Sequence, residues 1–164
     1  MSEEIFGAVQ KLPVNGTKKQ VVLQCAPLLT GIKLSNLLNV RSDQKEEVLR
    51  IFEGSPVCCR VLYEFQGRLS ILLYRPGMLA AYLEREDVKK LMTSFGYENP
   101  DLEETLNRIA DAYQDHMNGK RGFPHEIGLV LGYPPVDVEG FIEKEGRDFL
   151  YSGYWKVYGN LEDT

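Results

Sequence analysis

The chain has 164 residues and a mass of 18.7 kDa, enough for one ordinary domain with a buried core. Apolar residues make up 43% and charged residues 26%, which is typical of a globular protein and excludes a largely disordered one. The net charge of -5 argues against a general nucleic-acid binder, because such proteins usually carry a basic stripe.

The sequence does not match the pattern of a membrane helix or of a secretory signal. No apolar run approaches the roughly 18 residues of a membrane helix, and the start Met-Ser-Glu-Glu is acidic, unlike a secretory signal. Three cysteines without zinc-type spacing fit a reducing cytosol. We therefore expect a cytoplasmic protein, one domain over residues 1–164, with a loosely ordered N-terminal segment over 1–16.

Two helices are predicted in the first third of the chain. Thr17 and Gln20 form a capping box that opens a short helix, and Pro27 ends it near Cys25 because its ring would clash with a carbonyl one turn earlier. Asp43 and Glu46 repeat the capping signal for a second helix, whose apolar stripe is Val48, Leu49 and Phe52. Gly54 closes that second helix.

A β-hairpin gives the clearest signal. From Val57 to Phe65 the odd positions are apolar or aromatic, and after Gln66-Gly67 the alternation resumes at Leu69, Ile71 and Leu73. This is the pattern of two strands joined by a two-residue turn, with one face toward a core. Because side chains alternate along a strand, Cys58 and Cys59 point to opposite faces and should form neither a disulfide nor a joint metal site.

The remainder of the chain is mostly helical in pattern. Helices are predicted over 76–84 and 87–96, then from the Asn99-Pro100 cap to Gly119, and over 124–131 and 135–144. A second hairpin is predicted over 149–158 around Ser152-Gly153. Hairpins with a helical block between them indicate an α+β fold, a small antiparallel sheet packed against a block of short helices.

Three stretches together carry a resemblance to a known family. They are Cys-Ala-Pro-Leu-Leu-Thr-Gly-Ile-Lys at 25–33, Leu-Tyr-Arg-Pro at 73–76, and the run from Phe-Pro-His-Glu at 123–126 to Trp-Lys-Val-Tyr at 155–158. The chain resembles the bacterial family labelled domain of unknown function 3793 over roughly residues 23–160. The resemblance implies no activity, cofactor or catalytic residue.

Cys25 and His125 are the candidate catalytic residues. A thiol beside a helix break can have a lowered pKa and act as a nucleophile, with an imidazole as its base. The alternative for Cys25 is a small buried side chain packed against Leu28 and Leu29. His125 should lie in the first turn of a helix, where the dipole favours the neutral imidazole, and its alternative is a structural role in the Phe-Pro-His-Glu turn.

Candidate ligand-binding residues lie where elements end. Arg75 ends the second strand just before a helix begins, so it could clamp a carboxylate or phosphate, or form a structural ion pair with Glu126 or Asp137. Glu126, at the Phe-Pro-His-Glu helix start, is also a candidate ligand-binding residue. Lys33 and Lys156 have the same two interpretations. Tyr158 shares a strand face with Lys156 and could stack on a planar ligand. No metal site is predicted, because His125-Glu126 lacks a second histidine four residues on, where Leu129 stands.

The spacing of residues 126–142 is typical of a helix-turn-helix. DNA binding is nevertheless disfavoured, because the second helix carries Asp137, Glu139 and Glu143, which phosphates would repel. We therefore expect a small-molecule or cofactor-binding protein, with an enzyme whose pocket contains cysteine, histidine and arginine as the narrower form of this expectation. The alternative is a protein-interaction module that uses hairpin 126–142. The sequence does not specify a cofactor, and it leaves a homo-oligomer open.

Overall fold

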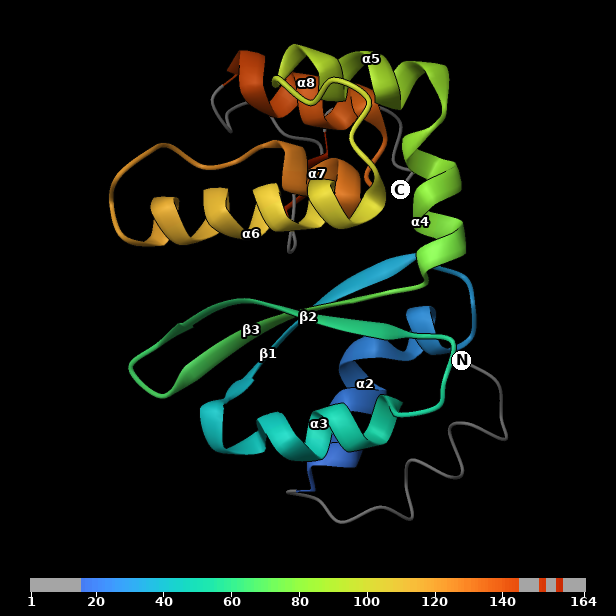
Figure 1. Cartoon of the computed structure of the whole chain (residues 1–164), viewed down its shortest axis with the longest axis vertical. Helices are drawn as coiled ribbons and strands as arrows, with labels where there is room; N and C mark the ends of the chain where they lie inside the picture. Colours follow the sequence, from blue (N-terminus) through green and yellow to red (C-terminus); the bar gives the residue numbers. More distant parts are fainter. Residues whose placement is uncertain (1–15, 145–150, 153–155, 158–164) are drawn as a thin grey trace. The chain divides into compact units, whose positions relative to one another are not determined.

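The computed structural model describes residues 16–144, 151–152 and 156–157. The chain divides into two compact units, Met1–Pro76 and Gly77–Thr164, which are described here one at a time (Figure 1). The N-terminal segment 1–15 lies outside the described residues, so its predicted loose order stays a prediction. The same holds for the predicted single domain.

The first unit contains a three-stranded antiparallel sheet. Its strands are β1 (Ser35–Arg41), β2 (Cys58–Phe65) and β3 (Arg68–Tyr74), in the order β1-β3-β2. The β2–β3 hairpin is confirmed, and both turn residues have the positive φ of a type I′ turn, 51° at Gln66 and 78° at Gly67. The register shifts between Val61 and Tyr63, a bulge that interrupts the predicted alternation.

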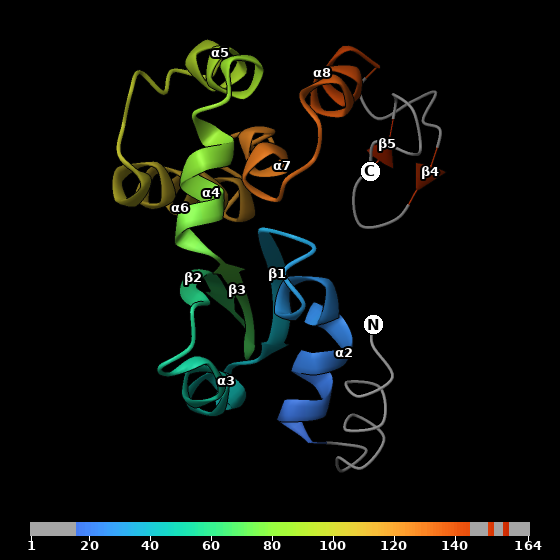
Figure 2. The same cartoon turned by 90° about the vertical axis from the view of Figure 1, so that its right-hand side faces the viewer.

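Two helices cover one face of this sheet, as Figures 1 and 2 show. They are α2 (Thr17–Leu29) and α3 (Lys45–Phe52). Their buried side chains join those of β1 and β3 in one apolar cluster, against which partly buried side chains of β2 pack. The cluster includes Val21, Cys25, Leu28, Leu38, Val40, Val48, Phe52, Leu69, Ile71 and Leu73. The alternation of β3 thus buries the predicted face, whereas Phe65 at the hairpin end is 54% exposed.

Helix α2 differs from its prediction at both ends. Gly16 is its N-cap and no side chain caps it, so the predicted Thr17–Gln20 capping box is wrong. The backbone departs from helical geometry at Cys25 (φ -118°, ψ 15°), near the predicted end, but the helix resumes through Pro27 to Leu29. The kink accommodates the proline ring, and for this reason Pro27 does not terminate the helix.

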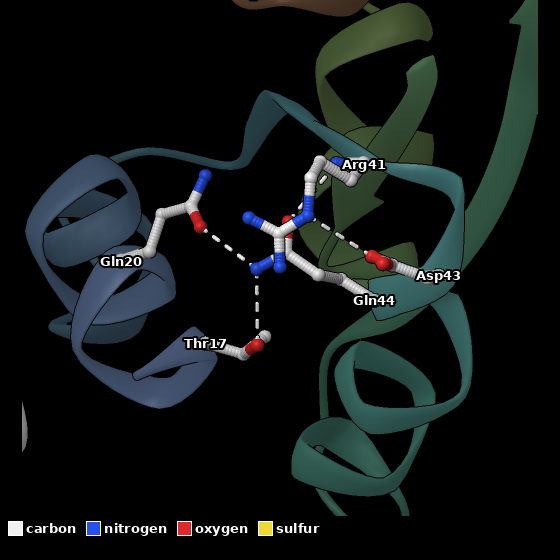
Figure 3. A network of polar contacts seen from close by, with 5 residues as sticks. All are labelled: Thr17, Gln20, Arg41, Asp43 and Gln44. Atoms are coloured by element: carbon white, nitrogen blue, oxygen red, sulfur yellow. Dashed lines mark hydrogen bonds and ion pairs between the residues drawn. The ribbon is translucent and has the colours of Figure 1, made fainter. Parts of the chain in front are cut away.

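Thr17 and Gln20 instead bind a side chain from the next segment. Gln44 belongs to the short 3₁₀ turn Ser42–Gln44 before α3, and its Nε2 donates to Thr17 Oγ1 and to Gln20 Oε1, both at 3.0 Å (Figure 3). Its Oε1 accepts the backbone N–H of Arg41 at 2.9 Å. Gln44 is buried, so this network ties the start of α2 to the end of β1.

The second unit is helical with a small hairpin. Its elements are α4 (Pro76–Leu83), α5 (Glu86–Ser94), α6 (Leu102–Met117), α7 (Glu126–Val130), α8 (Pro135–Lys144), β4 (Tyr151–Ser152) and β5 (Lys156–Val157). The five predicted helices are present, and the α+β class is confirmed. The N-cap of α6 is Asp101, whose Oδ1 accepts the N–H of Glu104 at 2.8 Å, and not the predicted Asn99-Pro100 pair. None of the helices in the described residues is long and apolar enough to cross a bilayer.

Strands β4 and β5 pair antiparallel, so the second hairpin is confirmed where it is described. Tyr151 is paired with Val157, and Ser152 with Lys156. Tyr158 lies outside the described residues, and its predicted face stays a prediction.

Candidate functional site

The predicted site residues are distributed over both units. They are Cys25, Lys33 and Arg75 in the first unit and His125, Glu126, Lys156 and Tyr158 in the second. Only the backbone of Lys156 is described, in β5, and Tyr158 lies outside the described residues. A shared cavity for Cys25, Arg75 and His125 stays a prediction.

Cys25 lies at the kink of α2 with none of its surface exposed. The Asn36 side chain donates to its Sγ at 3.4 Å. Burial raises the pKa of the Cys25 thiol to about 11, and the Asn36 hydrogen bond lowers it only in part. The thiol is therefore protonated at neutral pH, which opposes the nucleophilic role predicted for it.

Arg75 has a structural partner that the sequence did not indicate. Its Nε donates to Leu28 O and its Nη2 to Leu29 O, both at 3.1 Å, and these are the last two residues of α2. A cation at this end of a helix satisfies free carbonyls and complements the helix dipole. Two donors of the guanidinium thus stabilise the end of α2.

Lys33 follows the same turn. Its backbone N–H donates to Pro27 O at 3.0 Å, and its side chain is half-buried. Burial lowers the pKa of Lys33, an effect that the nearby Cys25 opposes. In the first unit, Cys25, Lys33 and Arg75 thus all lie around the C-terminal half of α2.

The second unit contains a pocket of about 110 Å³, here called the α5–α6 pocket. It is lined by the end of α4, by α5, by the segment that joins α5 to α6, and by the first turn of α6. One part of the lining is apolar: Ala80, Leu83, Met92, Pro100 and Leu102. These side chains offer a small ligand a surface on which carbon atoms can be buried.

The other part of the lining is polar. Lys89 Nζ lies 3.4 Å from Glu84 Oε2, and both side chains are well exposed, at 41% and 70%. Thr105 Oγ1 donates to the backbone oxygen of Asp101 at 2.8 Å, and Asn99 adds an amide. Ammonium, carboxylate, hydroxyl and amide groups thus stand beside an apolar wall.

Tyr97 connects this pocket to a predicted site residue. It lines the pocket, is 4% exposed, and its hydroxyl donates to Glu126 Oε2 at 3.0 Å. The Arg108 guanidinium lies 4.1 Å from the centre of the Tyr97 ring and donates to Gly96 O at 3.0 Å. Burial, with Glu126 close by, raises the pKa of Tyr97, so its hydroxyl stays protonated and remains a donor.

Glu126 is the first residue of α7 and is 3% exposed. Besides Tyr97, its carboxylate faces Arg121, with Nη2 3.9 Å from Oε1. An ionised carboxylate is stable in such a place only if donors and positive charge compensate its loss of water. The Tyr97–Glu126 pair therefore fixes the tyrosine in the pocket wall.

His125 occupies the N-cap position of α7, next to this pair. Its ring lies between those of Phe123 and Phe141, with centroids 5.5 and 5.3 Å away. Burial lowers the pKa of His125, so the imidazole is neutral as expected, although burial and not the helix dipole is the main cause. Its Nδ1 is buried and has no hydrogen-bond partner in the part of the chain that the structure describes.

The sequence analysis named Glu126, which contacts the pocket residue Tyr97, and did not name the pocket residues Lys89, Met92 and Tyr97. Only weak sequence signals mark the pocket region: Gly96-Tyr97 stands at the end of one predicted helix, and Asn99-Pro100-Asp101 stands at the start of the next. A pocket between helices depends on how side chains pack, which no short spacing encodes. Within the described residues, no group of three or more His, Cys, Asp or Glu could hold a metal ion.

Comparison with known proteins gives one match. A family model with the description "Protein of unknown function (DUF3793)" matches residues 21–164. Neither the search of curated proteins nor the search of solved structures gave a match.

Proposed function

Since the chain belongs to the family described as protein of unknown function (DUF3793), we propose a function from its own geometry: a cytosolic protein that binds a small molecule in the α5–α6 pocket. The observation that carries this proposal is the lining of the pocket, apolar on one side and polar on the other. Ligand sites are typically apolar cavities with a few polar groups that fix orientation.

The size of the pocket limits the ligand. A dry cavity of about 150 Å³ holds a molecule of benzene's size, and the α5–α6 pocket measures about 110 Å³. It therefore suits a metabolite of few heavy atoms, or one end of a larger molecule. Tyr97 supports the proposal because its contacts to Glu126 and Arg108 hold one wall in place before a ligand arrives.

An enzyme based on Cys25 and His125 is a narrower form of the same idea. The neutral imidazole of His125 could accept a proton, which favours it. The protonated, fully buried thiol of Cys25 weighs against it. Binding without catalysis is therefore the form of the proposal that the geometry supports best.

A thermal-shift screen with two matched variants tests the proposal. The screen covers metals, nucleotides, flavins and common metabolites, because ligands that bind only the native state raise its melting temperature. Ala80 lines the pocket, whereas Ala81 on the same helix is exposed. A compound that stabilises the wild type should also stabilise Ala81→Phe but not Ala80→Phe, whose added ring fills the pocket.

The proposal fails if every stabilising compound acts equally on both variants. It fails also if no compound of any class stabilises the wild type. Far-ultraviolet circular dichroism of Ala80→Phe checks that the variant is folded.

The second candidate function is a protein-interaction module. A separate groove of about 740 Å³ lies beside α5 and the start of α8, and Val136 on its wall is 52% exposed. If this groove holds a second copy of the chain, light scattering should show an oligomer that Val136→Glu dissociates. Met117→Glu, which changes a residue that is 47% exposed and lies outside the groove, is the control.

A further inference from the structure

We propose that the ligand of the α5–α6 pocket is a free α-amino acid with a short aliphatic side chain, an inference that rests on the proposed function. The polar lining carries both signs of charge, positive at Lys89 and negative at Glu84 and Asp101. An amino acid carries an ammonium and a carboxylate on the same carbon atom, so it complements both signs at once.

The charged groups of the lining retain bonding capacity. Lys89 has three donors, and its contact to Glu84 at 3.4 Å is an exposed pair of a kind that is weak. Asp101 uses Oδ1 to accept the N–H of Glu104 at 2.8 Å, and a carboxylate offers further lone pairs. A ligand carboxylate can therefore bind Lys89 while its ammonium binds Glu84 or Asp101.

Ligands with a single charge fit less well. A simple carboxylate would be attracted by Lys89 but repelled by Glu84 and Asp101, and a simple amine would be repelled by Lys89. Uncharged molecules could form hydrogen bonds with these groups but would gain no attraction between opposite charges. The mixed lining therefore selects a zwitterion.

The apolar part of the lining limits the size and polarity of the ligand's side chain. Leu83, Met92 and Leu102 face a volume of about 110 Å³, which holds about three or four carbon atoms when compared with the cavity that holds benzene. Tyr97 is held by Glu126 and Arg108, so this space cannot expand easily toward it. Valine fits these limits, and tryptophan does not.

Isothermal titration calorimetry with valine and its analogues tests the inference. Valine should bind, whereas isobutylamine, which lacks the carboxylate, and isovalerate, which lacks the ammonium, should each bind about fivefold more weakly or worse. Alanine lacks two of the carbons of valine and should bind about fifteenfold more weakly, because each buried carbon is worth about fourfold in affinity.

Two variants locate the charge contact. Lys89→Met should weaken valine binding about fivefold and should strengthen isobutylamine binding, because the amine is no longer repelled by the lysine charge. Lys90→Met, on the same helix outside this pocket, should behave like the wild type. The amino-acid class is overturned if the single-charge analogues bind as well as valine, or if both lysine variants respond alike.

The outcomes separate this inference from the proposed function. If another compound binds and Ala80→Phe abolishes its binding, the pocket is a ligand site and the amino-acid class is wrong. If Ala80→Phe abolishes the binding of nothing, both the pocket and the class are wrong.

Discussion

At the scale of single residues, burial sets the chemistry of the side chains that the sequence singled out. Cys25 has no exposed surface and accepts a hydrogen bond of 3.4 Å from Asn36, whereas Glu126 is 3% exposed, accepts one of 3.0 Å from Tyr97 and faces Arg121. The sequence shows residue types and spacing, and it does not show how much water surrounds each group. For that reason the sequence could suggest Cys25 as a nucleophile, but it could not show that burial raises the pKa of its thiol.

The reactivity of the cysteines should follow their burial. At about pH 8, iodoacetamide should modify Cys58, which is exposed, quickly and Cys25 hardly at all, because the pKa of Cys25 is raised to about 11 by burial. Peptide mass spectrometry after timed alkylation measures both rates. In Cys58→Ser the fast adduct should disappear. Native-state modification of Cys25 as fast as that of Cys58 would contradict this prediction.

The lowered pKa of His125 makes stability depend on pH. Burial keeps the folded imidazole neutral, whereas the unfolded imidazole takes up a proton below about pH 6.5. The unfolded state thus binds more protons in this range, so stability is present above about pH 6.5 and is lost as the pH falls toward the folded pKa. His125→Phe keeps an aromatic ring between Phe123 and Phe141 but has no imidazole to protonate. As the pH falls, this variant should therefore lose less stability than the wild type.

Urea unfolding of the wild type and of His125→Phe, each at about pH 7.5 and about pH 5.5, measures how much unfolding free energy each protein loses as the pH falls. His116→Phe is the matched control, because its ring also contacts Phe123. Equal loss of unfolding free energy in the wild type and in His125→Phe would contradict the assignment.

At the scale of elements, the β2–β3 hairpin was predictable because alternation and the Gln66-Gly67 turn act over a short range. Strand β1 was not predicted, although it pairs with β3 along its whole length. Its residues Asn36 and Asn39 disfavour strands, so β1 exists because of its pairing with β3 and the burial of Leu38 and Val40. Tertiary packing determined this element.

The hydrogen bonds of Gln44 join the start of α2 to the end of β1 through side chains. Gln44→Leu removes three hydrogen bonds and leaves a buried hydroxyl at Thr17 and a backbone N–H at Arg41 without their partner. We expect a loss of about 3 kcal/mol in the free energy of unfolding, measured by urea denaturation. Gln24→Leu, on an exposed position of α2, should change it by less than about 0.5 kcal/mol. A Gln44→Leu protein as stable as this control would show that the network contributes little.

At the scale of the whole molecule, the α+β class and the family could be predicted, and the pocket could not. Motifs such as Phe-Pro-His-Glu at 123–126 lie in one stretch of sequence, whereas the α5–α6 pocket collects residues from Ala80 to Thr105 out of three helices and a loop. Glu126 links the motif to the pocket, because it is part of the motif and accepts a hydrogen bond from the pocket residue Tyr97. The proposed function depends on the pocket and not on the motif.

The most direct measurement uses methionine methyl groups as reporters. The chain has four methionines, and Met92 lines the pocket, whereas Met78 and Met117 are exposed elsewhere. In protein labelled with ¹³C at the methionine methyls, with Met92→Leu used to assign its signal, valine should shift the Met92 signal and leave those of Met78 and Met117 in place. An unchanged Met92 signal at every ligand tried, or equal shifts at all three, would contradict binding in the α5–α6 pocket.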